Sequence, residues 1–170
     1  MTMPDQQPAA ELAPWGPEID LYWEDFQVGQ VHQLGSHLIS AAEIVEFGRR
    51  FDPQPFHVDP ERAARSPFQG LIASGWHSAS LWMRLYWDSL LCRSASLGSP
   101  GVEDLDWLVP VRPDDELRGS LEIISARPSR SRPDRGLVQV RAELTDQHDV
   151  VKLRMTVWGL FGRRSTATGG

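Results

Sequence analysis

Residues 51–77 read FDPQPFHVDPERAARSPFQGLIASGWH, and the rest of the chain can be understood from this stretch. It begins with Asp52 and His57, which are five positions apart on a turn stiffened by prolines. We interpret this part as an acid/base pair on a rigid loop, because proline fixes the backbone angle φ. The stretch ends near Gly75, where the apolar run SASLWMRLYWDSLL follows. We interpret that run as a long buried helix whose first amides are free to bind an oxyanion.

The helix predicted over residues 75–91 has apolar side chains on nearly every side. A helix with this composition is buried, whereas a surface helix has one apolar stripe. Within it, Arg84 and Asp88 are spaced to form an ion pair. We also assign four tryptophans to the core rather than to a substrate site. They are Trp76, Trp82 and Trp87 of this helix and Trp107 further along the chain.

A second helix is predicted to begin at Ala41, because Ser40 and Glu43 form a capping box. It ends at Asp52, since a residue before proline is disfavoured in the helical region. The following run DPQPFHVDP holds three prolines, so we expect a stiff, non-helical overhang. Asp59 is placed to cap a short helix that starts with Pro60.

Alternation with a period of two predicts strands in most of the remaining chain. They span residues 31–38, 102–109, 116–126, 136–145 and 150–161, with a hairpin turn at 147–149. One long helix and several antiparallel strands define an α+β fold in which a curved sheet covers a central helix. Periodicity alone does not give the order of the strands.

The size and composition of the chain restrict its class. With 170 residues, 41% hydrophobic and 24% charged, it is most simply one globular domain. We expect a loose arm over residues 1–18, the domain over 19–163 and a disordered tail over 164–170. The formal charge of −6 argues against nonspecific binding of nucleic acid.

Neither a membrane protein nor a disulfide-stabilised protein is expected. No apolar run reaches the ~20 residues of a membrane span, and the N-terminus lacks the features of a signal peptide. Cys92 is the single cysteine, which excludes an internal disulfide and a cysteine-based zinc finger. These observations together favour the cytoplasm.

The motifs resemble a known family. Residues 52–57, DPQPFH, followed by Asp59-Pro60 and then by FQGLIASG at residues 68–75, resemble the MaoC-like dehydratases, which include (R)-specific enoyl-CoA hydratases. The similarity extends over residues 22–163 and includes the segment DWLVPVRPDDELRG. Gln54 stands where the family usually has Asn, and Ser74 stands where His is common before the glycine.

The resemblance implies a hotdog fold and the reversible addition of water to a 2-enoyl-CoA, giving a 3-hydroxyacyl-CoA, as in fatty acid metabolism. Asp52 and His57 would be the catalytic residues, and the amide of Gly75 would bind the thioester oxygen. Gln54 would contact water or ligand, or stabilise the loop. No cofactor is implied besides the coenzyme A of the substrate, no metal is implied, and the family indicates a homodimer.

Other functions are compatible with single features of the chain. A hotdog thioesterase usually carries a carboxylate in the central helix, and here the first two turns of that helix have none. A non-catalytic acyl-thioester binding protein is a further alternative. A metal site of His57, Asp59 and His77 has no supporting ligand spacing, and Ser78 is not in a GxSxG elbow.

Two further groups are interpreted structurally. His77 is assigned to the core rather than to the site. The arginines of the connection RPSRSRPDRG are assigned to a solvated loop rather than to the phosphates of coenzyme A: Arg127, Arg130, Arg132 and Arg135.

Overall fold

The computed structural model describes residues 19–164. In chain order the elements are η2 (Trp23–Asp25), β1 (Val31–Leu38), α1 (Ala41–Phe51), α2 (Pro55–Val58), α3 (Pro60–Ala64), α4 (Gly75–Ser89), η3 (Leu91–Arg93), β2 (Gly101–Trp107), β3 (Glu116–Pro128), β4 (Arg135–Thr145) and β5 (Val151–Gly162). The strands form one five-stranded antiparallel sheet in the order β1-β3-β4-β5-β2. The predicted α+β class and all predicted strands are confirmed, with ends shifted by one or two residues.

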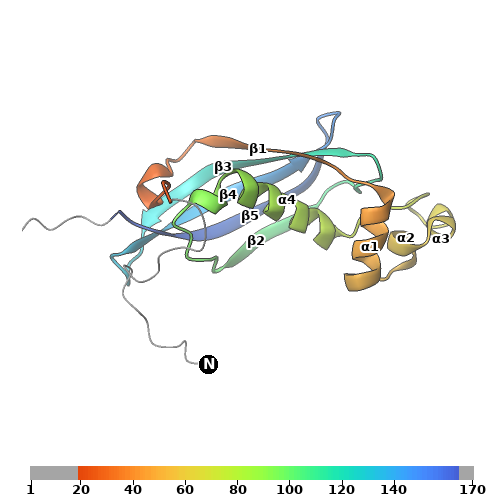
Figure 1. Ribbon diagram of the computed structural model, residues 1–170, viewed down its shortest axis with the longest axis horizontal. Coiled ribbons are helices and arrows are strands. Elements are labelled where there is room, and N and C mark those ends of the chain that lie inside the picture. Colours follow the sequence, from red (N-terminus) through yellow and green to blue (C-terminus); the bar gives the residue numbers. More distant parts are fainter. Residues whose placement is uncertain (1–18, 165–170) are drawn as a thin grey trace, which may run out of the picture.

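The sheet curves around α4, and the short helices α1, α2 and α3 gather beyond one end of it (Figure 1). The side of α4 that faces the sheet is buried, with Trp82 1% exposed. The indole N–H of Trp82 donates to the carbonyl oxygen of Ser120 on β3 at 3.0 Å, so the buried polar group is satisfied. This packing fixes the direction in which α4 presents its first residues.

The other side of α4 differs from the prediction of a helix buried all round. Trp76 and Trp87 are 59% and 43% exposed, and Trp107 on β2 is 48% exposed. Their assignment to the core was therefore wrong, whereas that of Trp82 is confirmed. Helical periodicity separates apolar from polar faces, but it does not show which apolar face the same chain covers.

Capping explains where the helices start. Ser40 and Glu43 form the predicted capping box of α1. Asp59 accepts a hydrogen bond from the Arg62 amide at 3.0 Å and caps α3, also as predicted. The prediction that residues 52–60 are entirely non-helical was wrong, because Pro55 begins the one-turn helix α2. Proline fits the first position of a helix, where its missing N–H is not needed.

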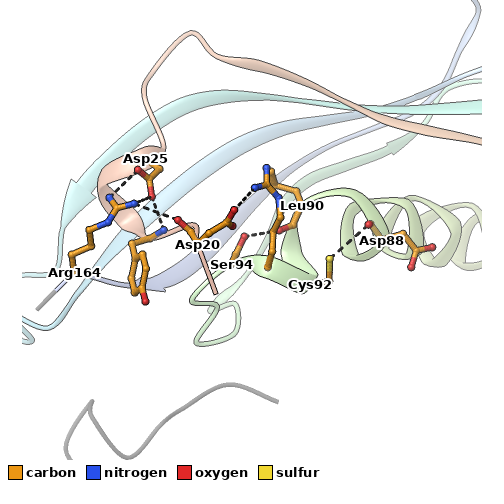
Figure 2. A network of polar contacts seen from close by, with 9 residues as sticks. Asp20, Asp25, Asp88, Leu90, Cys92, Ser94 and Arg164 are labelled. Atoms are coloured by element: carbon orange, nitrogen blue, oxygen red, sulfur yellow. Dashed lines mark hydrogen bonds and ion pairs between the residues drawn. The ribbon is translucent and has the colours of Figure 1, made fainter. Parts of the chain in front are cut away.

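The first and last described residues lie together. The guanidinium group of Arg164 donates to both carboxylate oxygens of Asp25, at 2.8 and 2.7 Å, and to the carbonyl oxygen of Asp20 at 3.3 Å (Figure 2). The predicted arm over residues 1–18 lies outside the described residues, and so does the predicted tail over 164–170 except for its first residue, Arg164. Within residues 19–164, no helix is long and apolar enough to cross a membrane.

A buried charged cluster closes the sheet at the end near α1. The ammonium group of Lys152, 7% exposed, lies 3.0 Å from Asp146 and 3.2 Å from Asp115. It also donates to the carbonyl oxygen of Pro110 at 3.3 Å. The cluster therefore connects the turn between β4 and β5 with the segment between β2 and β3.

Asp146 should stabilise the fold in a pH-dependent way. Burial raises the pKa of its carboxyl group, but hydrogen bonds from the Val150 amide, Lys152 and the His148 amide outweigh burial and lower the pKa to about 2. This pKa lies below that of an aspartate in the unfolded chain, which is about 4. The stabilisation is therefore fully present above about pH 4 and is lost as the pH falls towards 2.

We therefore expect Asp146→Asn to lower the free energy of unfolding by on the order of 2 kcal/mol at neutral pH. Urea denaturation at a series of pH values should show the gap to the wild type narrowing below about pH 4. A gap that is absent at pH 7, or unchanged on acidification, would contradict this role.

Candidate active site

Asp52 and His57 meet at the end of the sheet near α1. Asp52 follows the last residue of α1, and His57 is the third residue of α2. The His57 Nε2 atom lies 3.3 Å from Asp52 Oδ2, and the His57 side chain is 5% exposed. The structure thus brings together the two residues that the sequence suggested as an acid/base pair, although on a helical turn and a helix end rather than on one loop.

The hydrogen bonds of His57 define its tautomer. Its Nδ1 atom lies 2.8 Å from the carbonyl oxygen of Ile72. Because a carbonyl oxygen only accepts, Nδ1 carries a hydrogen, and in the neutral ring Nε2 has the free lone pair. Asp52 and His57 line the same cavity, so in the neutral form of the ring two acceptor atoms lie side by side there.

Both oxygens of Asp52 are held by neighbouring side chains. The amide of Gln54 donates to Oδ1 at 2.9 Å, and the hydroxyl of Ser74 donates to Oδ2 at 2.7 Å. Burial raises the pKa of Asp52, but these two hydrogen bonds and the nearby His57 together lower it below its ordinary value. Asp52 is therefore held as a carboxylate.

Gly48 determines how closely α2 can approach α1. A Cβ atom added at Gly48 would lie 2.9 Å from the backbone oxygen of His57 and 3.1 Å from its Cβ atom. No other residue fits there without displacing the backbone of α2. Sequence patterns gave no role to Gly48, because a glycine inside a predicted helix does not show what packs against it.

The first turn of α4 forms the floor of a cavity of about 410 Å³ next to this pair. Within residues 19–164 the N–H of Gly75 has no hydrogen-bond acceptor. A Cβ atom at Gly75 would lie 2.4 Å from the ring of Trp107, so the indole packs directly on the Gly75 Cα atom. The remaining wall is mostly apolar and includes Phe56, Phe68, Ile72, Trp76 and Val111.

Two parts of this wall had no site role in the sequence analysis. Trp107, which was assigned to the core, ends β2, and Val109 and Val111 follow it. Lys152 comes from β5. The family resemblance covers the first segment without giving its residues a role. The signal that could have found them is the concentration of apolar residues around Pro110, just after an edge strand.

Other candidate residues lie away from the cavity. His77 is 7% exposed, and its ring stacks on Phe47 at 4.5 Å, as expected for a core histidine. Asp59 is occupied in capping α3, so it and His77 do not line the cavity with His57. Asp88 pairs with Arg84 at 2.7 Å near the far end of α4, as predicted.

The basic connection lies at the opposite end of the sheet. Its flanking residues pair as Pro128 with Gly136 and Arg135 with Gly162, whereas the cavity adjoins the end where Thr145 pairs with Val151. In a single chain, the arginines of this connection are therefore remote from Asp52 and His57.

The arrangement defines a class of protein. A central helix wrapped by a curved antiparallel sheet, with an acidic residue and a histidine at the start of that helix, is the hotdog fold of the MaoC-like hydratases and dehydratases. The family profile described as MaoC like domain matches residues 26–147. The chain belongs to this family.

Individual relatives agree with this assignment. The crystal structure of a MaoC-like dehydratase from Rhodospirillum rubrum is 41% identical, with a TM-score of 0.80 over 86% of this chain and 99% of that one. The uncharacterised protein YdeM of Bacillus subtilis is 30% identical over 75% of this chain and 89% of its own length. The 3-hydroxybutyryl-CoA dehydratase of Methylorubrum extorquens is 31% identical over 66% of this chain and 69% of its own.

The contact at Gly48 can be tested by Gly48→Ala. A helical Gly→Ala change normally stabilises by about 0.5–1 kcal/mol. Here we expect destabilisation by about 1–3 kcal/mol in urea denaturation, because the new methyl group overlaps the backbone of His57. The matched control is Gly162→Ala, where the nearest atom would be 3.4 Å away and little change is expected. A stabilised Gly48→Ala protein would refute the close approach.

Proposed function

We propose that the protein catalyses the reversible addition of water to a 2-enoyl-CoA, giving a 3-hydroxyacyl-CoA. The observation that carries this proposal is the convergence of Asp52 and His57, 3.3 Å apart, beside the first amide of α4. The reaction transfers no electrons to an acceptor, so we expect no cofactor besides the coenzyme A of the substrate.

Two acceptors facing one space can hold a water molecule by both of its hydrogens. One O–H group donates to the Asp52 carboxylate and the other to Nε2 of His57, which leaves the oxygen lone pairs directed into the cavity. The oxygen adds to Cβ of the enoyl thioester, the pair takes a proton from the water, and Cα receives a proton. Dehydration follows the same path in reverse.

Addition to the double bond places negative charge on the thioester oxygen. The N–H of Gly75, which has no acceptor among residues 19–164, lies at the positive end of α4 and is a preorganised donor for that charge. The ring of Trp107 on the Gly75 Cα atom covers this side of the amide with apolar surface. A hydrogen bond to an oxyanion is stronger where water is excluded.

The relatives support this reaction class without establishing the substrate. The Methylorubrum extorquens relative is named as a 3-hydroxybutyryl-CoA dehydratase. This chain has Asp52 and His57, the two residues that the reaction needs. We therefore propose an acyl-CoA substrate. The mostly apolar wall around the site suits a hydrocarbon acyl group.

A hotdog thioesterase is the main alternative, and an acyl-thioester binding protein without turnover is another. Among the described residues that line the cavity, Asp52 is the one carboxylate, and the first turn of α4 has none. Purified protein incubated with crotonyl-CoA and a medium-chain enoyl-CoA distinguishes the three. Hydration without release of free thiol supports the proposal, thiol release supports a thioesterase, and binding alone supports the third.

Asp52 and His57 should act as one unit. Asp52→Asn keeps the shape and removes the charge, and His57→Ala removes the second acceptor. Each change should lower kcat by at least the ~10²–10⁴ usual for an acid/base group. Because both side chains hold the same water, the double variant should be little worse than the poorer single variant.

Thermal melting of the three variants is the control for folding. We expect all three to stay folded, because both residues lie outside the core of the sheet. A folded Asp52→Asn protein with near-normal hydratase turnover would refute the mechanism. Single losses that multiply fully in the double variant would show that the two residues do not share one water.

We further propose that the chain assembles as a homodimer. β2 is an edge strand, and large apolar residues are exposed on it and on the adjacent face of α4: Val102, Trp107, Met83, Trp87 and Trp76. The rings of Trp76 and Trp107, 5.3 Å apart, connect the two parts into one surface. A free edge beside an apolar surface is a typical site for a second copy of the chain.

Light scattering should give twice the 19.1 kDa of the chain for the wild-type protein. Val102→Lys on β2 should shift the protein towards monomer, because a charge at a pairing edge opposes association. Val31→Lys is the matched control, since Val31 is 60% exposed on β1, the opposite edge of the sheet. A stable wild-type monomer, or equal effects of the two changes, would contradict the dimer.

A further inference from the structure

Ser74, the residue before Gly75, has contacts that the proposed reaction does not explain. Ser74 is 1% exposed, and its hydroxyl group lies between two different elements of the site. On one side the oxygen is 2.7 Å from Asp52 Oδ2. On the other side it accepts from the amide of Trp76 at 3.3 Å, and it thereby caps α4.

These two contacts fix the direction of the hydrogen bond to Asp52. The Trp76 amide can only donate, so it uses an acceptor site of the Ser74 oxygen and leaves the hydroxyl hydrogen for the carboxylate. A donor to a carboxylate stabilises the ionised form relative to the neutral acid. Ser74 therefore stabilises Asp52 as an anion and also fixes the orientation of its Oδ2 atom towards His57.

Ser74 differs in exposure from the other side chain that contacts this carboxylate. Gln54 donates to Asp52 Oδ1 at 2.9 Å, but Gln54 is exposed, so water competes for the same contact. The Ser74 hydroxyl is shielded from water. The oxygen that Ser74 binds is also the one nearest to His57 Nε2, at 3.3 Å.

We propose that Ser74 is a positioning residue, which ties Asp52 to the first turn of α4 and keeps it a carboxylate directed at His57 while the site turns over. This inference rests on the proposed hydratase function. It also links the acid/base pair to the Gly75 amide, because Ser74 is the neighbour of Gly75 and caps the same helix. One hydroxyl group thus sets the relative position of the two halves of the site.

The test compares Ser74→Ala with Ser74→Thr, which keeps the hydroxyl. Loss of the donor should raise the pKa of Asp52, so the acidic limb of kcat/KM against pH should move to higher pH in Ser74→Ala. kcat at neutral pH should fall by about tenfold to a hundredfold with little change in KM, because a hydrogen bond to a charged group is lost. Ser74→Thr should restore the wild-type limb.

Ser80→Ala is the matched control. Ser80 is an exposed serine of α4 whose hydroxyl donates to the carbonyl oxygen of Trp76 at 2.8 Å, and it does not line the cavity. The Ser80→Ala change should leave the acidic limb of the kcat/KM profile at its wild-type pH. If Ser74→Ala fails to fold, because the cap of α4 is lost, Ser74→Cys keeps a weak donor of similar size and should move the limb in the same direction.

A second readout does not depend on turnover. Carbon NMR titration of the aspartate carboxyl groups, with the Asp52 signal identified by its absence in Asp52→Asn, should show Asp52 titrating at higher pH in Ser74→Ala than in the wild type. An unchanged titration and an unmoved limb would overturn the role of Ser74. A wild type that titrates as expected but hydrates no enoyl-CoA would instead refute the proposed function.

Discussion

The Asp52 carboxylate joins three helices, and the geometry of the site depends on this junction. Asp52 ends α1, its Oδ1 atom accepts from Gln54 just before α2, and its Oδ2 atom accepts from Ser74 at the start of α4. The position of α2, which carries His57, depends on these contacts, because a helix of one turn is not stable by itself. Asp52 is half-buried, and a partly desolvated carboxylate is stabilised by hydrogen bonds. The hydrogen bonds that it accepts here align His57 with the first amide of α4.

Local sequence signals predicted much of this arrangement. The capping box of α1, the Asp59 cap of α3, the helix stop before Pro53 and the alternation of the strands depend on neighbouring residues. For this reason α1, α3 and β1–β5 were predicted within one or two residues. The prolines around His57 were misjudged, because Pro55 is both a helix breaker and a good first residue of a helix. Asp52 and His57 were singled out from their spacing and from the family resemblance.

Contacts between distant segments could not be predicted in this way. Nothing near Gly48 in the sequence shows that His57 packs against it, and nothing near Lys152 shows that it forms ion pairs with Asp115 and Asp146. The exposed tryptophans are a related case, because composition marks Trp76 and Trp107 as apolar without showing whether the same chain buries them. These contacts depend on tertiary packing, which a pattern along one chain does not contain.

Trp107 lies on an edge strand and also forms a wall of the cavity, and this position has a thermodynamic consequence. If the free edge of β2 pairs with a second copy, a ligand that presses on Trp107 also acts on the surface of association. A single coupling free energy then connects ligand binding with subunit association. Each equilibrium therefore changes the equilibrium constant of the other by the same factor. Substrate would alter the dissociation constant of the subunits, and dilution of the protein would alter its affinity for substrate.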